Sequence, residues 1–212
     1  MINYQVLPNL GYLEVDLSEE ELQPIKQEIT KIQKNFTKNI EYNSSLAGNI
    51  EKEYLLLDSR AYLNNLVFSY LKEYDKITEF TKRIAMLTDD CPMIIDRPWV
   101  NFQKKYEFNP PHNHSGIASF VIWIQIPYNI QDEINTVQSK KSLNPSAGHF
   151  SFHYTNVLGE ISHCKIAADK KMENKLLIFP AGLTHSVYPF FTSDDYRISV
   201  SGNVKYFTQQ GK

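Results

Sequence analysis

The chain has 212 residues, and its 22 Lys and Arg against 24 Asp and Glu give a formal net charge of -2. A chain of this length fits one domain that buries about two thirds of its unfolded surface, so folding alone requires no disulfide or metal. The hydrophobic fraction of 42% and the aromatic fraction of 13% exclude a disordered chain. A near-neutral charge argues against a dedicated nucleic-acid-binding protein, which usually carries a basic excess.

Three further features predict a cytoplasmic protein without a membrane partner. The first residues have no basic region followed by an apolar one, as a signal peptide does. The longest apolar run, residues 117–126, is far shorter than the ~20 residues of a membrane helix. Cys91 and Cys164 are isolated, which fits reduced thiols, although a single disulfide stays open as an alternative.

Before residue 96, helical periodicity dominates. Ser18 and Glu21 form a capping-box pattern at a helix start, and we expect Pro24 to restart that helix at its first turn. Residues 4–7 and 12–17 alternate like edge strands. Apolar residues recur every three or four positions in three stripes: Leu22, Ile25, Ile29, Ile32 and Phe36; Leu63, Leu66, Val67, Tyr70, Leu71 and Tyr74; and Ile77, Phe80, Ile84 and Leu87.

After residue 96, the pattern changes to short segments rich in β-branched and aromatic residues. The expected strands are residues 98–102, 117–126, 150–155, 175–179 and 197–207. Strands without intervening helices favour an antiparallel sandwich or jelly roll. Residues 128–148 are polar and long for a loop, which fits either a lid or a disordered insertion.

We therefore expect an α+β fold: a double-stranded β-helix (jelly roll) over residues 97–207 with a mostly helical support region over residues 1–96. The two regions are expected to form one continuous domain.

All six histidines lie between positions 112 and 185. His112 and His114 are two residues apart on an extended segment, so both side chains point to the same side and can reach one metal ion. This pair alone also fits a Pro-rich surface turn. His185 follows a buried strand and a Pro-Ala-Gly turn, and a jelly roll can bring it opposite an earlier strand. Three protein ligands on one face leave three positions open on iron, as oxygen activation requires.

The other histidines have weaker interpretations. His149 and His153 share one side of a predicted strand, and a solvated outer face is favoured over the pocket. His163 lies beside Cys164 but lacks the spaced partners of a zinc site.

Arg197 and Ser199 share one face of the last predicted strand. An Arg inside a barrel needs an anion, because burying its charge alone is costly. A guanidinium beside a hydroxyl suits a carboxylate, which it can bind in bidentate fashion. The alternative is an ion pair with Asp194 or Asp195.

Taken in order, these residues resemble the 2-oxoglutarate/Fe(II)-dependent oxygenases of the prolyl-hydroxylase-like superfamily, and more narrowly an oxygenase family of marine bacteria and tailed phages. The matching motifs are Trp99-Val-Asn101, His112-Asn-His114, Phe179-Pro180 through His185-Ser-Val187-Tyr-Pro189, and Arg197-Ile-Ser199-Val-Ser201-Gly-Asn203. They cover about half of the chain. His-x-His is unspecific by itself, whereas the ordered set is specific.

The resemblance implies a dioxygenase that uses Fe(II) and 2-oxoglutarate to hydroxylate an unidentified substrate, with succinate and CO2 as co-products. It implies three iron ligands, and a site for the distal carboxylate of 2-oxoglutarate at Arg197 and Ser199. The implied ligands are His112, His114 and His185. Asn101 and Trp123 are further candidates for the co-substrate pocket; the alternatives are that Asn101 holds a strand end and that Trp123 belongs to the core.

His114 departs from the wider superfamily, where most members carry Asp or Glu at this position. Three neutral histidines leave the metal site with one more positive charge. This departure also fits a catalytically silent jelly-roll binding module or a phage accessory protein. A cupin-like metalloenzyme that does not use 2-oxoglutarate is a third interpretation.

The substrate is not encoded in any motif, and a peptide side chain and a small metabolite are both open. A nucleic acid has a lower weight, because residues 128–148 are polar rather than basic. The expected compartment is the cytoplasm, or the host cytoplasm for a phage-encoded protein.

Overall fold

The computed structural model describes residues 9–84 and 91–207. Residues 4–7 and Leu87, which belong to a predicted strand and a predicted helix, lie outside the described residues. The described chain contains two antiparallel sheets. The seven-stranded sheet has the order β1-β9-β6-β11-β4-β2, with β3 pairing to β11, and the four-stranded sheet has the order β5-β10-β7-β8.

The elements of the described chain have the following bounds. The strands are β1 (Leu13–Asp16), β2 (Glu53–Leu55), β3 (Met93–Ile95), β4 (Trp99–Gln103), β5 (Asn109–His112), β6 (Ala118–Gln125), β7 (His149–Thr155), β8 (Ile161–Ala167), β9 (Lys175–Pro180), β10 (Thr184–Val187) and β11 (Arg197–Tyr206). The α-helices are α1 (Glu19–Lys34), α2 (Arg60–Thr78), α3 (Phe80–Arg83) and α4 (Ile130–Ile134). Among the described residues, no helix has both the length and the apolar character needed to span a bilayer.

Helix α1 begins as predicted, with Ser18 and Glu21 forming a reciprocal capping box. The prediction for Pro24 is wrong, because α1 runs unbroken through this residue. Pro24 lies in the second turn, where the missing N–H removes a single hydrogen bond. The buried side chains of Ile25 and Ile29 hold the helix in place.

Helix α2 begins next to a buried carboxylate of α1. Glu28 accepts hydrogen bonds of 2.7 to 2.9 Å from the backbone N–H groups of Leu57, Asp58 and Ser59, and one of 2.5 Å from the Ser59 hydroxyl. These bonds fix the chain where it enters α2. The third predicted helix is shorter than expected, because Glu79 adopts a left-handed conformation with φ of 49° and ends α2.

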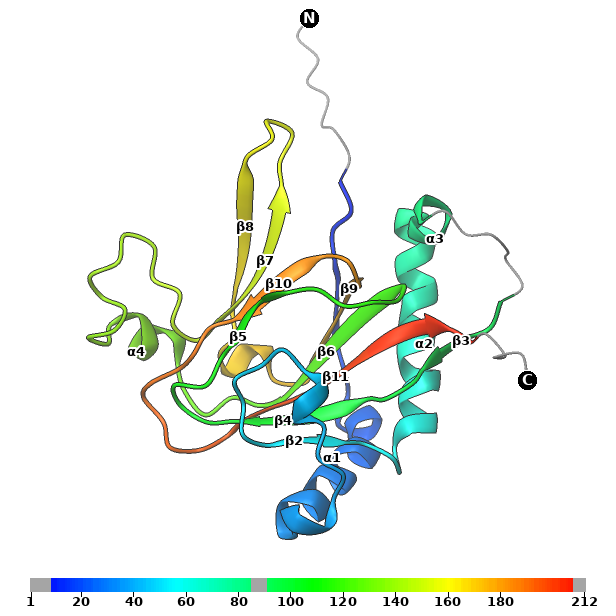
Figure 1. Cartoon of the computed structure of the whole chain (residues 1–212), viewed down its shortest axis with the longest axis horizontal. Coiled ribbons are helices and arrows are strands. Elements are labelled where there is room, and N and C mark those ends of the chain that lie inside the picture. Colours follow the sequence, from blue (N-terminus) through cyan, green and yellow to red (C-terminus); the bar gives the residue numbers. More distant parts are fainter. Residues whose placement is uncertain (1–8, 85–90, 208–212) are drawn as a thin grey trace, which may run out of the picture.

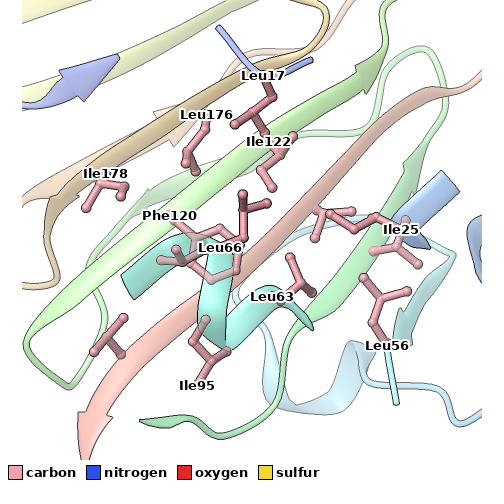
Figure 2. Close-up of a cluster of buried hydrophobic side chains, with 14 of the residues drawn as sticks. Leu17, Ile25, Leu56, Leu63, Leu66, Ile95, Phe120, Ile122, Leu176 and Ile178 are labelled. Atoms are coloured by element: carbon pink, nitrogen blue, oxygen red, sulfur yellow. The ribbon is translucent and has the colours of Figure 1, made fainter. Parts of the chain in front are cut away.

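The large sheet separates two hydrophobic cores. Helices α1 and α2 pack on one face, and the four-stranded sheet faces the other (Figure 1). Strand β6 serves both cores by alternation: Phe120 and Ile122 face the helices, whereas Val121 and Trp123 face the small sheet. Figure 2 shows part of the core on the helix side, including Leu17, Ile25, Leu56, Leu63, Leu66, Ile95, Phe120, Ile122, Leu176 and Ile178.

The space between the sheets holds aromatic and polar side chains. Its apolar part includes Phe150, Phe152, Phe179 and Phe190. Polar side chains of β4, β6 and β11 lie buried on the same inner face. The expected α+β fold with a double-stranded β-helix is confirmed, and β1, β2 and β3 from the first 96 residues complete its large sheet.

Candidate metal centre

Three histidines meet where β5 and β10 pair. His112 of β5 lies opposite His185 of β10 in the register of the small sheet. His114 follows β5, and its backbone N–H donates to the Ala181 carbonyl at 2.9 Å, just ahead of β10. One ring nitrogen of each histidine lies within 4.8 Å of the others. In the part of the chain that the structure describes, this is the only group of three or more His, Cys, Asp or Glu residues spaced to hold a metal ion.

Backbone carbonyls orient two of the rings. Nδ1 of His112 lies 2.7 Å from the Pro110 carbonyl, and Nδ1 of His185 lies 3.0 Å from the Leu183 carbonyl. A carbonyl only accepts, so each Nδ1 carries the hydrogen and donates it. In a neutral ring this leaves Nε2 unprotonated, which is the form that binds metals.

The three rings are neutral near pH 7. Burial lowers the pKa of His112, lowers that of His114 to about 4 and lowers that of His185 to about 3. Neighbouring histidines lower the pKa values of His114 and His185 further, and Lys205 adds to the effect on His114. No carboxylate contributes to these shifts. The donor set therefore fits a divalent metal ion such as Fe(II), whose ligands must be deprotonated.

A cavity of about 50 Å³ lies between the sheets beside these histidines. All the site residues expected from the sequence line it: His112, His114, His185, Arg197, Ser199, Asn101 and Trp123. Further polar side chains in its wall are Gln103, Asn109, Ser119 and Ser201. The described lining contains no Asp or Glu.

Arg197 is only 2% exposed, and its partners are neutral. Nε and Nη2 donate to Oε1 of Gln103 at 3.1 and 2.6 Å. Nη1 donates to the Tyr128 hydroxyl at 2.6 Å, and Nη2 to the Tyr188 carbonyl at 3.0 Å. The guanidinium also lies 5.5 Å from the centre of the Phe190 ring and 5.9 Å from that of Tyr128. These contacts fix the position of the Arg197 guanidinium, and none of them neutralises its positive charge.

An ion pair between Arg197 and Asp194 or Asp195 was the alternative that the sequence left open. Within the described residues, Arg197 forms no ion pair, and Asp194 pairs with Lys105 at 2.5 Å. A buried charge without a counterion is costly. The arrangement therefore suits an anionic ligand, such as the carboxylate of a co-substrate.

A directed hydrogen-bond chain joins Trp99, Asn101 and Ser199. Nε1 of Trp99 donates to Oδ1 of Asn101 at 3.1 Å, which leaves Nδ2 of Asn101 to donate to Oγ of Ser199 at 3.1 Å. Because Oγ of Ser199 already accepts, its own hydrogen is available to an acceptor in the cavity. Trp123 also faces the cavity and packs edge-on against Phe150, with ring centres 5.8 Å apart.

Sequence reasoning missed Gln103 and Tyr128 as partners of Arg197. The alternation of β4 offered a signal for Gln103, which lies two residues after Asn101 on the same face. Tyr128 begins the segment interpreted as a lid or a disordered insertion and carries no motif. Fully buried Glu133 holds that segment against residues 191 and 192, because its carboxylate accepts hydrogen bonds from their backbone N–H groups.

The remaining histidines do not line the cavity. Nε2 of His153 lies 2.8 Å from the Ser186 hydroxyl, and Nδ1 of His163 lies 2.8 Å from Nδ1 of His153. His149 places Nδ1 2.9 Å from the Ala147 carbonyl. These side chains are separate from the three-histidine cluster.

Comparisons with known proteins agree with the fold. The model of the family described as "Putative 2OG-Fe(II) oxygenase" matches residues 97–203, half of the chain. A search of curated protein sequences found no match.

Several solved structures have a similar fold. A Pseudomonas putida prolyl-4-hydroxylase is 11% identical, with a TM-score of 0.55 over 93% of this chain and 94% of the other. A Trichoplax adhaerens prolyl hydroxylase, solved with a peptide of hypoxia inducible factor, is 13% identical, with a TM-score of 0.52 over 93% and 84%. A collagen prolyl hydroxylase of Paramecium Bursaria Chlorella virus-1 is 10% identical, with a TM-score of 0.50 over 92% and 96%. The family match and the metal-binding geometry lead to one conclusion: the chain belongs to the 2OG-Fe(II) oxygenases, enzymes whose cofactors are Fe(II) and 2-oxoglutarate.

Proposed function

We propose that the protein is a dioxygenase that hydroxylates its substrate and forms succinate and CO2. The proposed iron ligands are His112, His114 and His185, and the proposed carboxylate anchors are Arg197 and Ser199. One observation carries the proposal: a neutral three-histidine cluster and a buried Arg197 without an acidic partner line the same cavity. Bound iron and 2-oxoglutarate supply the oxidising chemistry, while the protein supplies binding, orientation and exclusion of water.

Hydrogen bonds within the chain orient two of the proposed metal ligands without a bound ion. The carbonyls of Pro110 and Leu183 hold the rings of His112 and His185 with Nε2 free. Because all three proposed ligands are neutral, the protein does not offset the charge of the metal. That role falls to the anionic co-substrate.

The proposed carboxylate site combines two donors. A guanidinium has five N–H groups, and four hydrogen bonds to Gln103, Tyr128 and the Tyr188 carbonyl leave one N–H of Nη1 without a partner among the described residues. The Ser199 hydroxyl offers the second donor, oriented by Asn101. A carboxylate at this site would bind one donor of each residue, rather than two of Arg197.

Apolar side chains complete the wall of the cavity. Trp123, Phe150, Phe179 and Val187 line it together with the proposed metal ligands and Arg197. Such a wall excludes water from the reacting centre and strengthens the electrostatic interactions inside it.

The direct test is the visible charge-transfer band of Fe(II) with 2-oxoglutarate under nitrogen. We expect the band in the wild-type protein and its loss in His112→Ala and His185→Ala. His149→Ala is the matched control, because His149 also lies on a strand and places Nδ1 against the carbonyl two residues earlier, yet lies outside the cluster. A folded wild-type protein without the band would overturn the proposal.

Arg197→Met separates this function from the alternatives. We expect the variant to bind the metal ion but to lose 2-oxoglutarate binding. A metalloenzyme independent of 2-oxoglutarate would keep its activity in this variant. A silent binding module would bind the metal and form no succinate with any substrate.

For the substrate, we propose a peptide side chain as the first class to assay. Three structures with a similar fold are described as prolyl hydroxylases, and one of them holds a peptide. Proline-containing peptides should raise succinate formation above the rate without substrate. Small metabolites are the second class if they do not.

A further inference from the structure

We propose that Gln103 is a positioning residue for the co-substrate: a neutral partner that holds the Arg197 guanidinium while leaving its positive charge to the ligand. The inference rests on the proposed function, because it concerns the carboxylate that Arg197 would bind. It assigns a role to a residue outside the motifs that identified the site.

Gln103 takes the place that an acid normally has beside a buried Arg. Its side chain is buried, with the residue 3% exposed, and Oε1 accepts from both Nε and Nη2 of Arg197. Two N–H groups of one guanidinium commonly form this fork with a carboxylate. Here the amide oxygen of Gln103 accepts both hydrogen bonds, so the guanidinium is held in place and its charge is not neutralised.

The orientation of the amide is determined from both sides. Nε2 of Gln103 donates to the Glu107 carbonyl at 2.5 Å. A carbonyl cannot donate, so the nitrogen must lie on that side and the oxygen must face Arg197. Gln103 and Arg197 are also direct neighbours in the register of β4 and β11. Strand pairing and the Glu107 carbonyl therefore fix the contact together.

Acids in the surrounding segments are bound elsewhere. The Glu107 carboxylate accepts from the backbone N–H groups of residues 51 and 104. The Glu133 carboxylate accepts from those of residues 191 and 192 and from the Thr192 hydroxyl. Asp194 pairs with Lys105. These three carboxylates are thus occupied by other donors, and the side-chain partner of Arg197 on β4 is an amide.

A carboxylate at position 103 would compete with the ligand. A carboxylate would form an ion pair with Arg197 and so neutralise the guanidinium inside the protein. We therefore expect Gln103→Glu to weaken 2-oxoglutarate binding more than Gln103→Met, which removes the hydrogen bonds but adds no charge. A purely structural role of Gln103 would give equal losses in the two variants.

The experiment is calorimetric titration of the Mn(II)-loaded protein, as the whole 212-residue chain, with 2-oxoglutarate. We expect Gln103→Glu to lose at least about tenfold in affinity, and Gln103→Met to lose less than about fivefold, because only the acid neutralises the guanidinium that would bind the ligand. Gln125→Glu is the matched control: Gln125 lies on β6 beside Ile198 in the same sheet, is exposed and donates to the Tyr196 carbonyl. It should bind 2-oxoglutarate as the wild type does.

A second acidic variant and a metal-binding control separate loss of the ligand site from disruption of the fold. Glu at position 103 places an oxygen against the Glu107 carbonyl, so Gln103→Asp, whose shorter side chain avoids that carbonyl, is the second acidic variant. Mn(II) binding should be unchanged in every variant, because the histidines lie on other elements. An acidic variant that binds Mn(II) and also binds 2-oxoglutarate as tightly as Gln103→Met overturns the inference. A wild-type protein that binds Mn(II) but not 2-oxoglutarate overturns the proposed function instead.

Discussion

At the scale of single residues, His114 determines the charge of the proposed metal site. It contributes a neutral imidazole where most members of the wider superfamily have an acid. The lowered pKa values of His114 and His185 keep these rings neutral, and no carboxylate lines the cavity in the described chain. A metal ion at the proposed site would therefore meet three neutral donors and no counter-charge from the described residues.

The first prediction changes this charge. His114→Asp should raise Mn(II) affinity without 2-oxoglutarate by about tenfold, because a carboxylate ligand adds one negative charge beside the ion. Titration followed by the EPR signal of free Mn(II) measures the affinity. His149→Asp adds the same charge outside the cluster and should leave the affinity unchanged. Equal affinities for His114→Asp and the wild type would contradict the electrostatic argument.

The site residues differ in how well sequence could identify them. Residues that belong to a motif and carry a metal-binding or charged group, such as His112 and Arg197, stand out because their chemistry demands partners. Gln103 and Tyr128 are neutral, common in cores and surfaces, and acquire their role only when the fold places them beside Arg197. Their identification requires the register of β4 and β11 and the path of the chain after β6.

At the scale of elements, strand pairing aligns the site. Strands β2, β4, β11 and β6 are neighbours, and their register places Glu53, Asn101, Ser199 and Trp123 in one row across the sheet. A shift of one residue in any strand would turn its polar side chain toward the helices. The apolar alternation that packs α1 and α2 on the outer face therefore also fixes the inner face.

The strands that sequence predicted are those with a strong pattern of their own. Strands β6 and β9 are nearly continuous apolar runs, and β11 alternates over ten residues. Strand β5 contains two prolines, which local propensity places outside a sheet, and it is a strand because it pairs with β10. Such tertiary pairing is not visible in a local pattern, so the sequence predicts β5 only as an extended segment and does not predict β2, β3 or β8.

The second prediction concerns the junction of α1 and α2. Glu28→Gln should lower the free energy of unfolding by about 2 kcal/mol, because an amide nitrogen would replace an oxygen that accepts from residues 57 to 59. Urea denaturation followed by circular dichroism measures this change. Glu20→Gln on the exposed face of α1 is the control and should change stability little. Equal changes in the free energy of unfolding in the two variants would mean that the buried Glu28 carboxylate contributes no more to stability than a surface carboxylate.

At the scale of the whole molecule, one buried carboxyl links stability to pH. Glu53 is 1% exposed, and its Oε2 has no hydrogen-bond partner among the described residues. Burial, with a smaller effect of Glu107, raises the pKa of Glu53 from 4.5 to about 8. The folded protein thus keeps this proton at neutral pH, whereas the unfolded chain loses it.

The third prediction follows from this difference. Between the two pKa values the unfolded state binds fewer protons, so the free energy of unfolding falls as pH rises, by at most roughly 1.4 kcal/mol per pH unit. Glu53→Gln should remove this contribution and stabilise the protein more at pH 7.5 than at pH 5.5. Urea denaturation at both pH values tests it, with exposed Glu51→Gln as the control. If the free energy of unfolding of the Glu53→Gln and Glu51→Gln variants depended on pH in the same way, the raised pKa of Glu53 would be contradicted.

The acid-free cavity also has a thermodynamic consequence for the loaded protein. With the proposed ligands, a bound dianion would contact both the metal and Arg197, because both line the cavity. The metal would therefore strengthen the binding of the dianion. Linkage makes this effect reciprocal: the factor by which the metal tightens 2-oxoglutarate binding equals the factor by which 2-oxoglutarate tightens metal binding. The metal content of the protein would then follow the concentration of a central metabolite, so that iron is retained when 2-oxoglutarate is abundant and released when it is scarce.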